Sequence, residues 1–481
     1  MKRHRLRAIA LLLLLLAPAG KRRADAYSLL THEQLIDLTW QSSIVPLLLS
    51  RYPNLTPAEL EEARAYAYGG CVIQDIGYYP FGDGFFSNLT HYVRTGDFVV
   101  SLFRNATNAN ELAFAVGALS HYIGDSEGHS LATNLAVPVE FPALGAKYGP
   151  VVSYAEGQHQ HVQTEFAFDI NEVVHHRMAP LHYLRHVGLA VPVKQLALAF
   201  YQTYGITEDF SQKRGRRFNV GAYRFATRAF IPRIAYAVTL LHRRHEPADP
   251  ATSEASALEK EVTEVAAANN WDAYRRRAGI GTYMLAGFLL IVPKIGPLKM
   301  VAVKGPTEQT EIDYVHSVAV SERTLRRMLA RFTPPADRRR GVKPAAADPP
   351  AAVARAIASS AGDTEKEEPP LVSHDPRHPL PNRDLDTGRV VLPGGYSLTD
   401  ATYARLLHLL TLNPQAPIPP GIKEDVQAYY SNPHLPITTK KNPAAWAQVL
   451  ADLKTLAGMP TSRAPQPYPT YGDDAENASS Q

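Results

Sequence analysis

One short stretch of this sequence places two histidines and an aspartate at intervals of four residues. It reads His121-Tyr-Ile-Gly-Asp125-Ser-Glu-Gly-His129. On an α-helix, residues four positions apart lie about 40° from alignment, so all three side chains can project from one side. Burying such a row is costly unless a charged or strongly hydrogen-bonding partner lies between the side chains. The pattern therefore predicts a helix that carries either a metal site or a salt-bridged polar face.

Further imidazoles and carboxylates extend this pattern. His161 and Glu165 repeat the four-residue interval, while Asp75 and His91 flank a stretch rich in glycine, tyrosine and phenylalanine. Imidazole and carboxylate together suit zinc, and a single tetrahedral zinc needs only four ligands. The candidate ligands number five imidazoles and three carboxylates, enough for two or three ions: His32, Asp75, His91, His121, Asp125, His129, His161 and Glu165.

Composition narrows the kind of site. The chain of 481 residues has one cysteine, Cys71, which excludes a disulfide framework and a cysteine-ligated zinc site. It has 18 histidines. Hydrophobic residues make up 45%, enough for a packed core. The formal charge of +4 is too small over this length to indicate nucleic-acid binding.

The N-terminus predicts export to the periplasm or outside the cell. A basic start is followed by an apolar run at residues 8–19, whose length of about 12 residues falls short of the roughly 20 that span a bilayer. We expect a signal peptide over residues 1–26, whose cleavage leaves Tyr27 at the new N-terminus. Cleavage before Gly20 and an uncleaved short anchor are the alternatives.

The rest of the sequence predicts an all-α protein with a Pro-rich linker and a small helical C-terminal tail. Thr56-Pro57-Ala58-Glu59 has the residues of a helix start, whereas residues 76–89 and 138–157 favour ordered loops. The apolar segment 279–297 is interrupted by prolines, which favours a buried or surface hairpin over a membrane span. The expected divisions are a catalytic domain at 27–245, a helical extension at 246–332, a Pro/Ala-rich linker at 333–395, the tail at 396–462 and a disordered end at 463–481.

The order and spacing of the candidate ligands resemble those of the zinc-dependent phospholipase C family and of the related fungal single-strand nucleases. The resemblance covers residues 27–170 well and extends loosely to about residue 245. It implies a multi-helix domain that binds three zinc ions, one of them through the N-terminal amine and carbonyl of the mature chain. The implied ligand sets are Tyr27, His32 and Asp125 for one ion, Asp75, His91, His121 and Asp125 for the second, and His129, His161 and Glu165 for the third.

Two positions depart from the family pattern. His129 follows Asp125 at an interval of four positions, where the family has an interval of six, and His159 is the alternative ligand for the third site. Tyr27 replaces the N-terminal tryptophan of the nucleases, and Glu165 follows the phospholipase branch.

The resemblance implies hydrolysis of a phosphate ester by a water that clustered zinc ions activate. Asp75 is the candidate catalytic residue that orients this water or takes its proton. We expect a phospholipid or another phosphodiester as substrate and a peripheral contact with a membrane. A nuclease or nucleotidase on the same metal platform is the alternative, although the small net charge disfavours nucleic acid. A non-catalytic, zinc-stabilised module that binds an envelope partner is the third hypothesis.

Overall fold

The computed structural model describes residues 29–208, 210, 214–241, 249–276, 279–291, 305–332 and 377–462. Every regular element in these ranges is a helix or a helical turn, and the remaining backbone pairing is two isolated bridges. The predicted all-α fold is therefore confirmed. Tyr27, the signal peptide expected at 1–26, most of the expected linker and the end at 463–481 lie outside the described residues.

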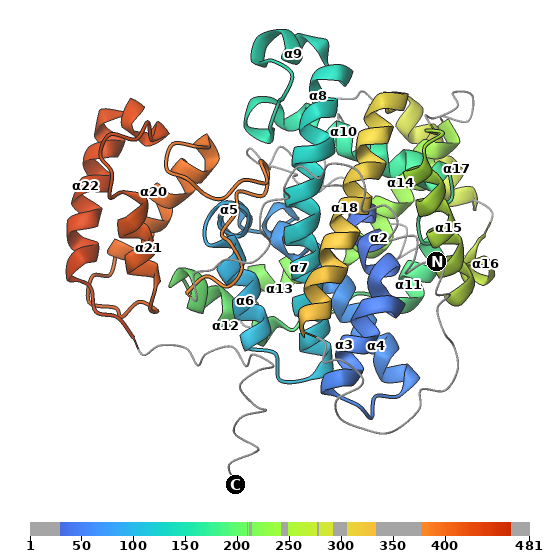
Figure 1. Ribbon diagram of the computed structural model, residues 1–481, viewed down its shortest axis with the longest axis horizontal. Coiled ribbons are helices and arrows are strands. Elements are labelled where there is room, and N and C mark those ends of the chain that lie inside the picture. The colour runs from blue at the N-terminus through green and yellow to red at the C-terminus, as the bar shows by residue number, and fades with distance from the viewer. Residues whose placement is uncertain are drawn as a thin grey trace, which may run out of the picture.

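The first part of the chain forms a helical core around one long helix, α7 (Figure 1). The predicted helix start at Thr56 is confirmed, because its side chain accepts a hydrogen bond from the Glu59 N–H and the Glu59 carboxylate accepts one in return. The elements of this core are α2 (Leu29–Thr39), η1 (Trp40–Ile44), α3 (Val45–Arg51), α4 (Pro57–Gly70), η2 (Ile73–Tyr78), α5 (Gly84–Tyr92), α6 (Thr95–Arg104), α7 (Ala109–Gly128), η3 (His129–Thr133), α8 (Asn134–Glu140), α9 (Pro142–Tyr148), α10 (Tyr154–Val174), α11 (Leu181–Val187), α12 (Val193–Tyr204), α13 (Arg214–Phe225), η4 (Ala226–Phe230) and α14 (Ile231–Leu241).

Small residues allow α4 and α7 to pack closely. A side chain at Gly117 would lie 2.2 Å from the Ala67 carbonyl oxygen, and one at Gly70 would lie 2.1 Å from that of Phe114. Nearly all of α7 is buried as a result. This central position holds the His121–Asp125 face of α7 inside the core.

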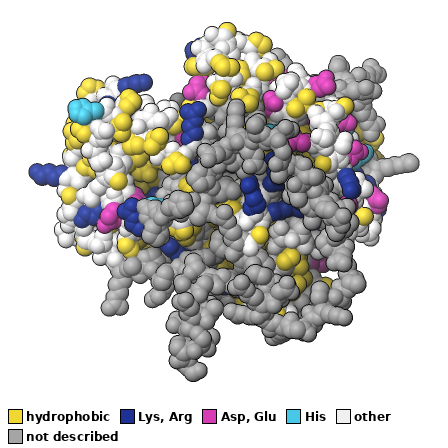
Figure 2. Space-filling view, in the orientation of Figure 1, with side chains coloured by type: hydrophobic (Ala, Val, Ile, Leu, Met, Phe, Trp, Pro, Cys, Tyr) yellow, Lys and Arg dark blue, Asp and Glu magenta, His cyan; other side chains and the backbone are white. Residues whose placement is uncertain are grey.

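The two stretches expected to be loops contain short helices. Asp83 begins α5 because its side chain accepts a hydrogen bond from the Phe85 N–H at 3.0 Å, so the second half of 76–89 is helical. The stretch 138–157 holds the end of α8, all of α9 and the start of α10. Helices α8 and α9 project from the core, and hydrophobic side chains such as Val139 and Tyr148 are exposed on this lobe (Figures 1 and 2).

The helical extension packs directly on the core. Tyr314 stacks on Phe168 with ring centroids 4.6 Å apart, and its hydroxyl lies 2.9 Å from that of Thr31. No helix in the described part of the chain is long and apolar enough to cross a membrane. The extension contains α15 (Ser253–Ala268), α16 (Trp271–Tyr274), α17 (Ile280–Ile291) and α18 (Glu308–Phe332).

The last part of the expected linker is a structured segment, which we call the strap and define as residues 377–395. Leu380 and Leu385 are buried, the Tyr122 hydroxyl donates to the Pro381 carbonyl at 2.7 Å, and the Leu385 N–H donates to the His91 carbonyl at 3.0 Å. Residues 377–395, which the sequence assigns to the linker, therefore pack against the core. The polar composition of this segment predicts a linker. The contacts named above are made by backbone groups and by two leucines, which composition does not reveal.

The tail forms a separate lobe beside the core (Figure 1). Its helices bury one face against each other, with Tyr403 stacked on Tyr429 at 3.7 Å between ring centroids. The elements of this lobe are α20 (Ser397–Thr411), α21 (Ile422–Tyr429), η7 (Thr438–Lys441) and α22 (Pro443–Gly458).

Candidate metal centre

The fold brings together all eight candidate ligands that the structure describes. They come from six elements, and every one of these side chains is almost completely buried. Helix α7 supplies His121 and Asp125, the turn η3 supplies His129, and α10 supplies His161 and Glu165, while His32 lies on α2, Asp75 on η2 and His91 on α5.

Asp125 lies between two groups of ligand atoms. Its Oδ1 is 3.1 Å from His32 Nε2, whereas its Oδ2 is 3.0 Å from His121 Nε2 and 3.3 Å from His91 Nε2. Asp75 Oδ1 approaches His91 Nε2 at 3.3 Å from the other side. One carboxylate oxygen of Asp125 thus faces each group, which is the arrangement that a bridging ligand requires.

The third group is built around Glu165. Its Oε1 lies 3.1 Å from His129 Nε2 and 3.0 Å from His161 Nε2. His129 reaches it because α7 ends at Gly128 and the chain continues as a turn of π-helix, which changes the direction of the side chains. His159 is exposed on α10, so the structure brings His129 into the group and leaves His159 out.

Backbone carbonyls orient three of the imidazoles. His91 Nδ1 lies 2.7 Å from the Ser87 carbonyl, His121 Nδ1 lies 3.1 Å from that of Cys71, and His129 Nδ1 lies 3.1 Å from that of Leu385. A carbonyl can only accept, so each Nδ1 carries a proton and donates it to its carbonyl. The Nε2 atoms therefore face the centre, as second-shell contacts of metal-bound histidines arrange them.

This arrangement gathers carboxylates and imidazoles inside the core. Both oxygens of Asp75 and of Asp125 are buried, and Asp75 Oδ1 and Asp125 Oδ2 face imidazole Nε2 atoms at 3.0–3.3 Å. Burial opposes the charge on Asp125, but His121 and His129 hold the pKa of its carboxyl well below the usual value. Burial lowers the pKa of His91, but Asp125 and Asp75 raise it well above its usual value. A divalent cation between these groups would take the place of the imidazole protons and balance the carboxylate charge. The donor set therefore fits divalent zinc.

Asp169 is a residue that the sequence pattern did not identify. Its carboxylate accepts hydrogen bonds from the N–H groups of Leu30 and Thr31 at 2.9 and 3.1 Å and from the Thr31 hydroxyl at 2.9 Å. These bonds hold the start of α2 next to His32. Asp169 follows Glu165 by four residues on α10, and this interval was the available signal.

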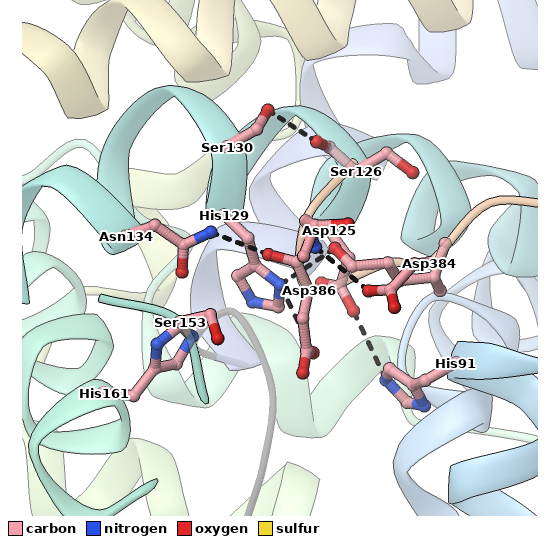
Figure 3. A network of polar contacts seen from close by, with 12 residues as sticks. His91, Asp125, Ser126, His129, Ser130, Asn134, Ser153, His161, Asp384 and Asp386 are labelled. Carbon is pink, nitrogen blue, oxygen red and sulfur yellow. Dashed lines mark hydrogen bonds and ion pairs between the residues drawn. The ribbon is translucent and has the colours of Figure 1, made fainter. Parts of the chain in front are cut away.

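The strap also contributes to the centre (Figure 3). Beside the Leu385 carbonyl, Asp386 Oδ1 lies 3.8 Å from His129 Nδ1, and its other oxygen accepts hydrogen bonds from the hydroxyls of Tyr92 and Tyr396 at 3.0 and 2.7 Å. The Asn134 side-chain amide donates to the Asp386 carbonyl at 2.7 Å. Because the strap lies more than 250 residues from His129 in sequence, no spacing pattern connects the two.

A fourth cluster of metal-ligating side chains lies between α6, the strap and α21. It contains Asp97, His378 and Asp425. Arg94 Nε approaches carboxylate oxygens of Asp97 and Asp425 at 3.0 and 2.9 Å, and so already supplies a positive charge. We therefore interpret this cluster as an ion-pair network that joins the tail to the core.

Comparison with known proteins connects the centre to one family. A family model described as zinc-dependent phospholipase C matches residues 31–209. No curated protein and no solved structure matches the chain significantly. The matched range includes all eight described ligands, whereas the strap and the tail lie outside it.

Proposed function

We propose, from the premise that residues 31–209 belong to the zinc-dependent phospholipase C family, that this protein is an exported zinc-dependent phosphodiesterase. The reaction is hydrolysis of a phosphate ester in a phospholipid, at a centre of three zinc ions. The observation that carries the proposal is the set of buried carboxylates and imidazole nitrogens that face one another within the core.

The proposal assigns a role to each ligand set. Tyr27, His32 and Asp125 would hold the first ion, and Asp75, His91 and His121, together with Asp125, would hold the second. His129, His161 and Glu165 would hold the third. Zinc, when bound, supplies Lewis-acid charge that activates water and neutralises phosphate oxygens.

Asp75 is the proposed catalytic residue. Burial raises the pKa of its carboxyl, while His121 and His91 oppose this shift. A carboxylate with a raised pKa is a better proton acceptor at neutral pH. Asp75 lies on η2, directly before the aromatic stretch, so it is placed to orient an attacking water and accept its proton.

Aromatic side chains that follow Asp75 in the sequence would contact an organic leaving group. The Tyr78 ring lies 5.9 Å from that of His91, and Phe81 pairs with Phe218 at the surface with 5.9 Å between centroids. An exposed aromatic pair can also stack a base, and this favours a nuclease as the second candidate function.

The experiment is an assay of zinc-loaded protein on two substrates. Release of a phosphorylated headgroup from phosphatidylcholine or phosphatidylglycerol vesicles supports the phospholipase, whereas cleavage of single-stranded DNA alone supports the nuclease. Asp75→Asn is the control that should lower either activity. Bound zinc without hydrolysis of either substrate would favour the non-catalytic module.

Export and the N-terminal ligand are tested together by sequencing the N-terminus of the protein recovered outside the cytoplasm. A start at Tyr27 supports both proposals. A start at Gly20 would contradict the amine ligand, because the amine would then lie seven residues before Tyr27.

A further inference from the structure

Helix α17 exposes a continuous apolar surface. Its sequence, IGTYMLAGFLLI, contains no charged residue, and only Thr282, Ala286 and Leu289 are buried. The exposed side chains include Ile280 at 81% exposure, Met284 at 71%, Leu290 at 67% and Ile291 at 80%. A helix that is apolar on all sides is normally buried in a protein or in lipid. This helix lies at the outer edge of the molecule, packed on α14 (Figure 1).

Arg233 lies against this helix and Arg185 lies near Arg233, and neither pairs with a carboxylate in the part of the chain that the structure describes. The Arg233 guanidinium is so close to α17 that a side chain at Gly281 would meet its Nη2 at 2.6 Å. Arg185 on α11 lies near Arg233, and burial together with that neighbouring charge lowers its pKa. Neither arginine forms an ion pair with any carboxylate among the described residues. Arg276 adds a further positive charge near Arg185, since both lower the pKa of His182, after burial.

We propose that α17, together with Arg185 and Arg233, is a docking surface for a membrane that contains anionic phospholipids. The apolar face of α17 enters the boundary between headgroups and acyl chains, and the two arginines contact lipid phosphates. Twelve residues of helix are about 18 Å long, too short to cross the roughly 30 Å hydrocarbon layer. The helix therefore lies on the membrane rather than across it.

The positive charge of the two arginines favours an anionic bilayer, rather than a second copy of this chain, as the partner that covers α17. In a twofold dimer the same patch lies on both sides of the interface, so pairing α17 with itself would bring the unpaired arginines of two subunits together. No carboxylate on α17 could compensate them, since the helix has none. An anionic lipid surface satisfies both the apolar face and the arginines.

The proposal goes beyond the catalytic one and can be tested separately from hydrolysis. The one native cysteine, Cys71, is fully buried, so a cysteine introduced on the surface can be labelled selectively. We would attach an environment-sensitive fluorophore to Met284→Cys in the full chain. Leu412→Cys in the tail is the matched control, since Leu412 is 65% exposed.

We expect the Met284→Cys label to move to shorter emission wavelengths with vesicles of equal phosphatidylglycerol and phosphatidylcholine, and much less with phosphatidylcholine alone. The Leu412→Cys label should not respond. Both proteins carry the same N-terminal apolar run, so the difference between the labels reports on α17. Replacing the arginines, as Arg185→Gln with Arg233→Gln, should raise the lipid concentration needed for half of the shift roughly 10- to 30-fold.

Three results would overturn the proposal. They are no shift of the Met284→Cys label, an equal shift for both labels, and a shift that grows with protein concentration without vesicles. The last would assign the surface to a second copy of the chain. Circular dichroism and the melting temperature establish that each variant is folded, and all substituted side chains lie on the surface or partly so. Vesicle binding without hydrolysis would leave the docking surface intact and would contradict only the phospholipase.

Discussion

At the scale of single residues, the centre consists of carboxylate oxygens and imidazole nitrogens that lie 3.0–3.3 Å apart inside the core. The four-residue spacings predicted the ligands on α7 and α10, because residues at that interval share a helix face whatever the tertiary structure. The sequence could not predict the hydrogen bonds that the carbonyls of Cys71 and Leu385 accept from His121 and His129. Every residue has a backbone carbonyl, so residue type does not indicate which carbonyl makes such a contact. Those carbonyls fix which nitrogen of each ring faces the centre.

The first prediction concerns His121, which belongs to two of the ligand groups. His121→Ala should remove metal from the group of Asp75 and His91, weaken zinc binding at the group of His32 and Asp125, and lower activity by at least about 100-fold, more than the loss of a second-shell residue. Zinc content measured by mass spectrometry and headgroup release check this expectation. His186→Ala is the control, because His186 pairs with Glu61 at the surface. Full zinc retention in His121→Ala would contradict the assignment.

The second prediction concerns Asp169. Asp169→Ala leaves the buried N–H groups of Leu30 and Thr31 without their acceptor, which should cost about 2–4 kcal/mol of unfolding free energy. It should also weaken zinc binding at His32, because the start of α2 is released. Denaturant unfolding and zinc titration measure the two effects. The exposed Asp272→Ala should change stability by less than about 0.5 kcal/mol, and equal effects of the two substitutions would refute the anchoring role.

At the scale of elements, the strap is the largest departure from the sequence-based prediction. Its proline, aspartate and arginine content is typical of a linker, although Leu380 and Leu385 are buried together with Asp384 and Asp386. The short helices α5, α8 and α9 were missed because glycine and proline usually mark loops. Here an aspartate cap begins α5, and Pro142 occupies the first position of α9, where its missing N–H costs nothing.

Gly388 tests whether the strap supports the centre. It has φ of +67°, and an added side chain would lie 2.2 Å from the Ser126 carbonyl oxygen on α7. Gly388→Ala should lower the free energy of unfolding by about 1–3 kcal/mol and loosen the strap over His129. Zinc affinity should fall roughly 10-fold, as measured by competition with a chelator.

The matched control is Gly458→Ala at the end of α22, where an added side chain meets nothing within 4 Å. Unchanged zinc affinity in Gly388→Ala, despite a lower melting temperature, would show that the strap stabilises the fold without orienting the ligand.

The ion-pair network of Asp97, His378 and Asp425 predicts how the packing of the tail against the core depends on pH. Hydrogen bonds to Asp425 and Asp97 raise the pKa of His378 to about 10 against the opposing effect of burial. A raised pKa means that this stabilisation is complete below the ordinary value of 6.5 and is lost as the pH rises through about 10. Neighbouring Arg94 stays charged throughout, because Asp97 and Asp425 raise its pKa although burial lowers it.

We therefore expect the tail to become more sensitive to limited proteolysis between pH 7 and about pH 10. His378→Gln should be sensitive already at pH 7 and should lose most of this change. The difference in proteolysis between the unaltered protein and His378→Gln reports the contribution of His378 alone, because other groups that titrate in this range are the same in both. An identical pH profile for both would contradict the role of the network.

At the scale of the whole molecule, the catalytic unit and its support come from distant parts of the chain. The all-α class and the resemblance to the family whose model matches residues 31–209 were predictable, since helical periodicity and the spacing of the ligands are local features of the sequence. The packing of α18 against the core and of the strap against the centre depends on contacts between residues far apart in sequence, which periodicity does not encode. The ligand centre is therefore surrounded by parts of the chain that the family match does not include.

The central claim is that the buried side chains form a three-zinc centre. Anomalous scattering at the zinc edge from crystals of the protein, combined with zinc content per chain, tests it most directly. The account predicts three peaks, one at each group: between His32 and Asp125, between Asp75 and His91, and between His129, His161 and Glu165. Fully folded protein with no anomalous peak at these side chains would contradict it.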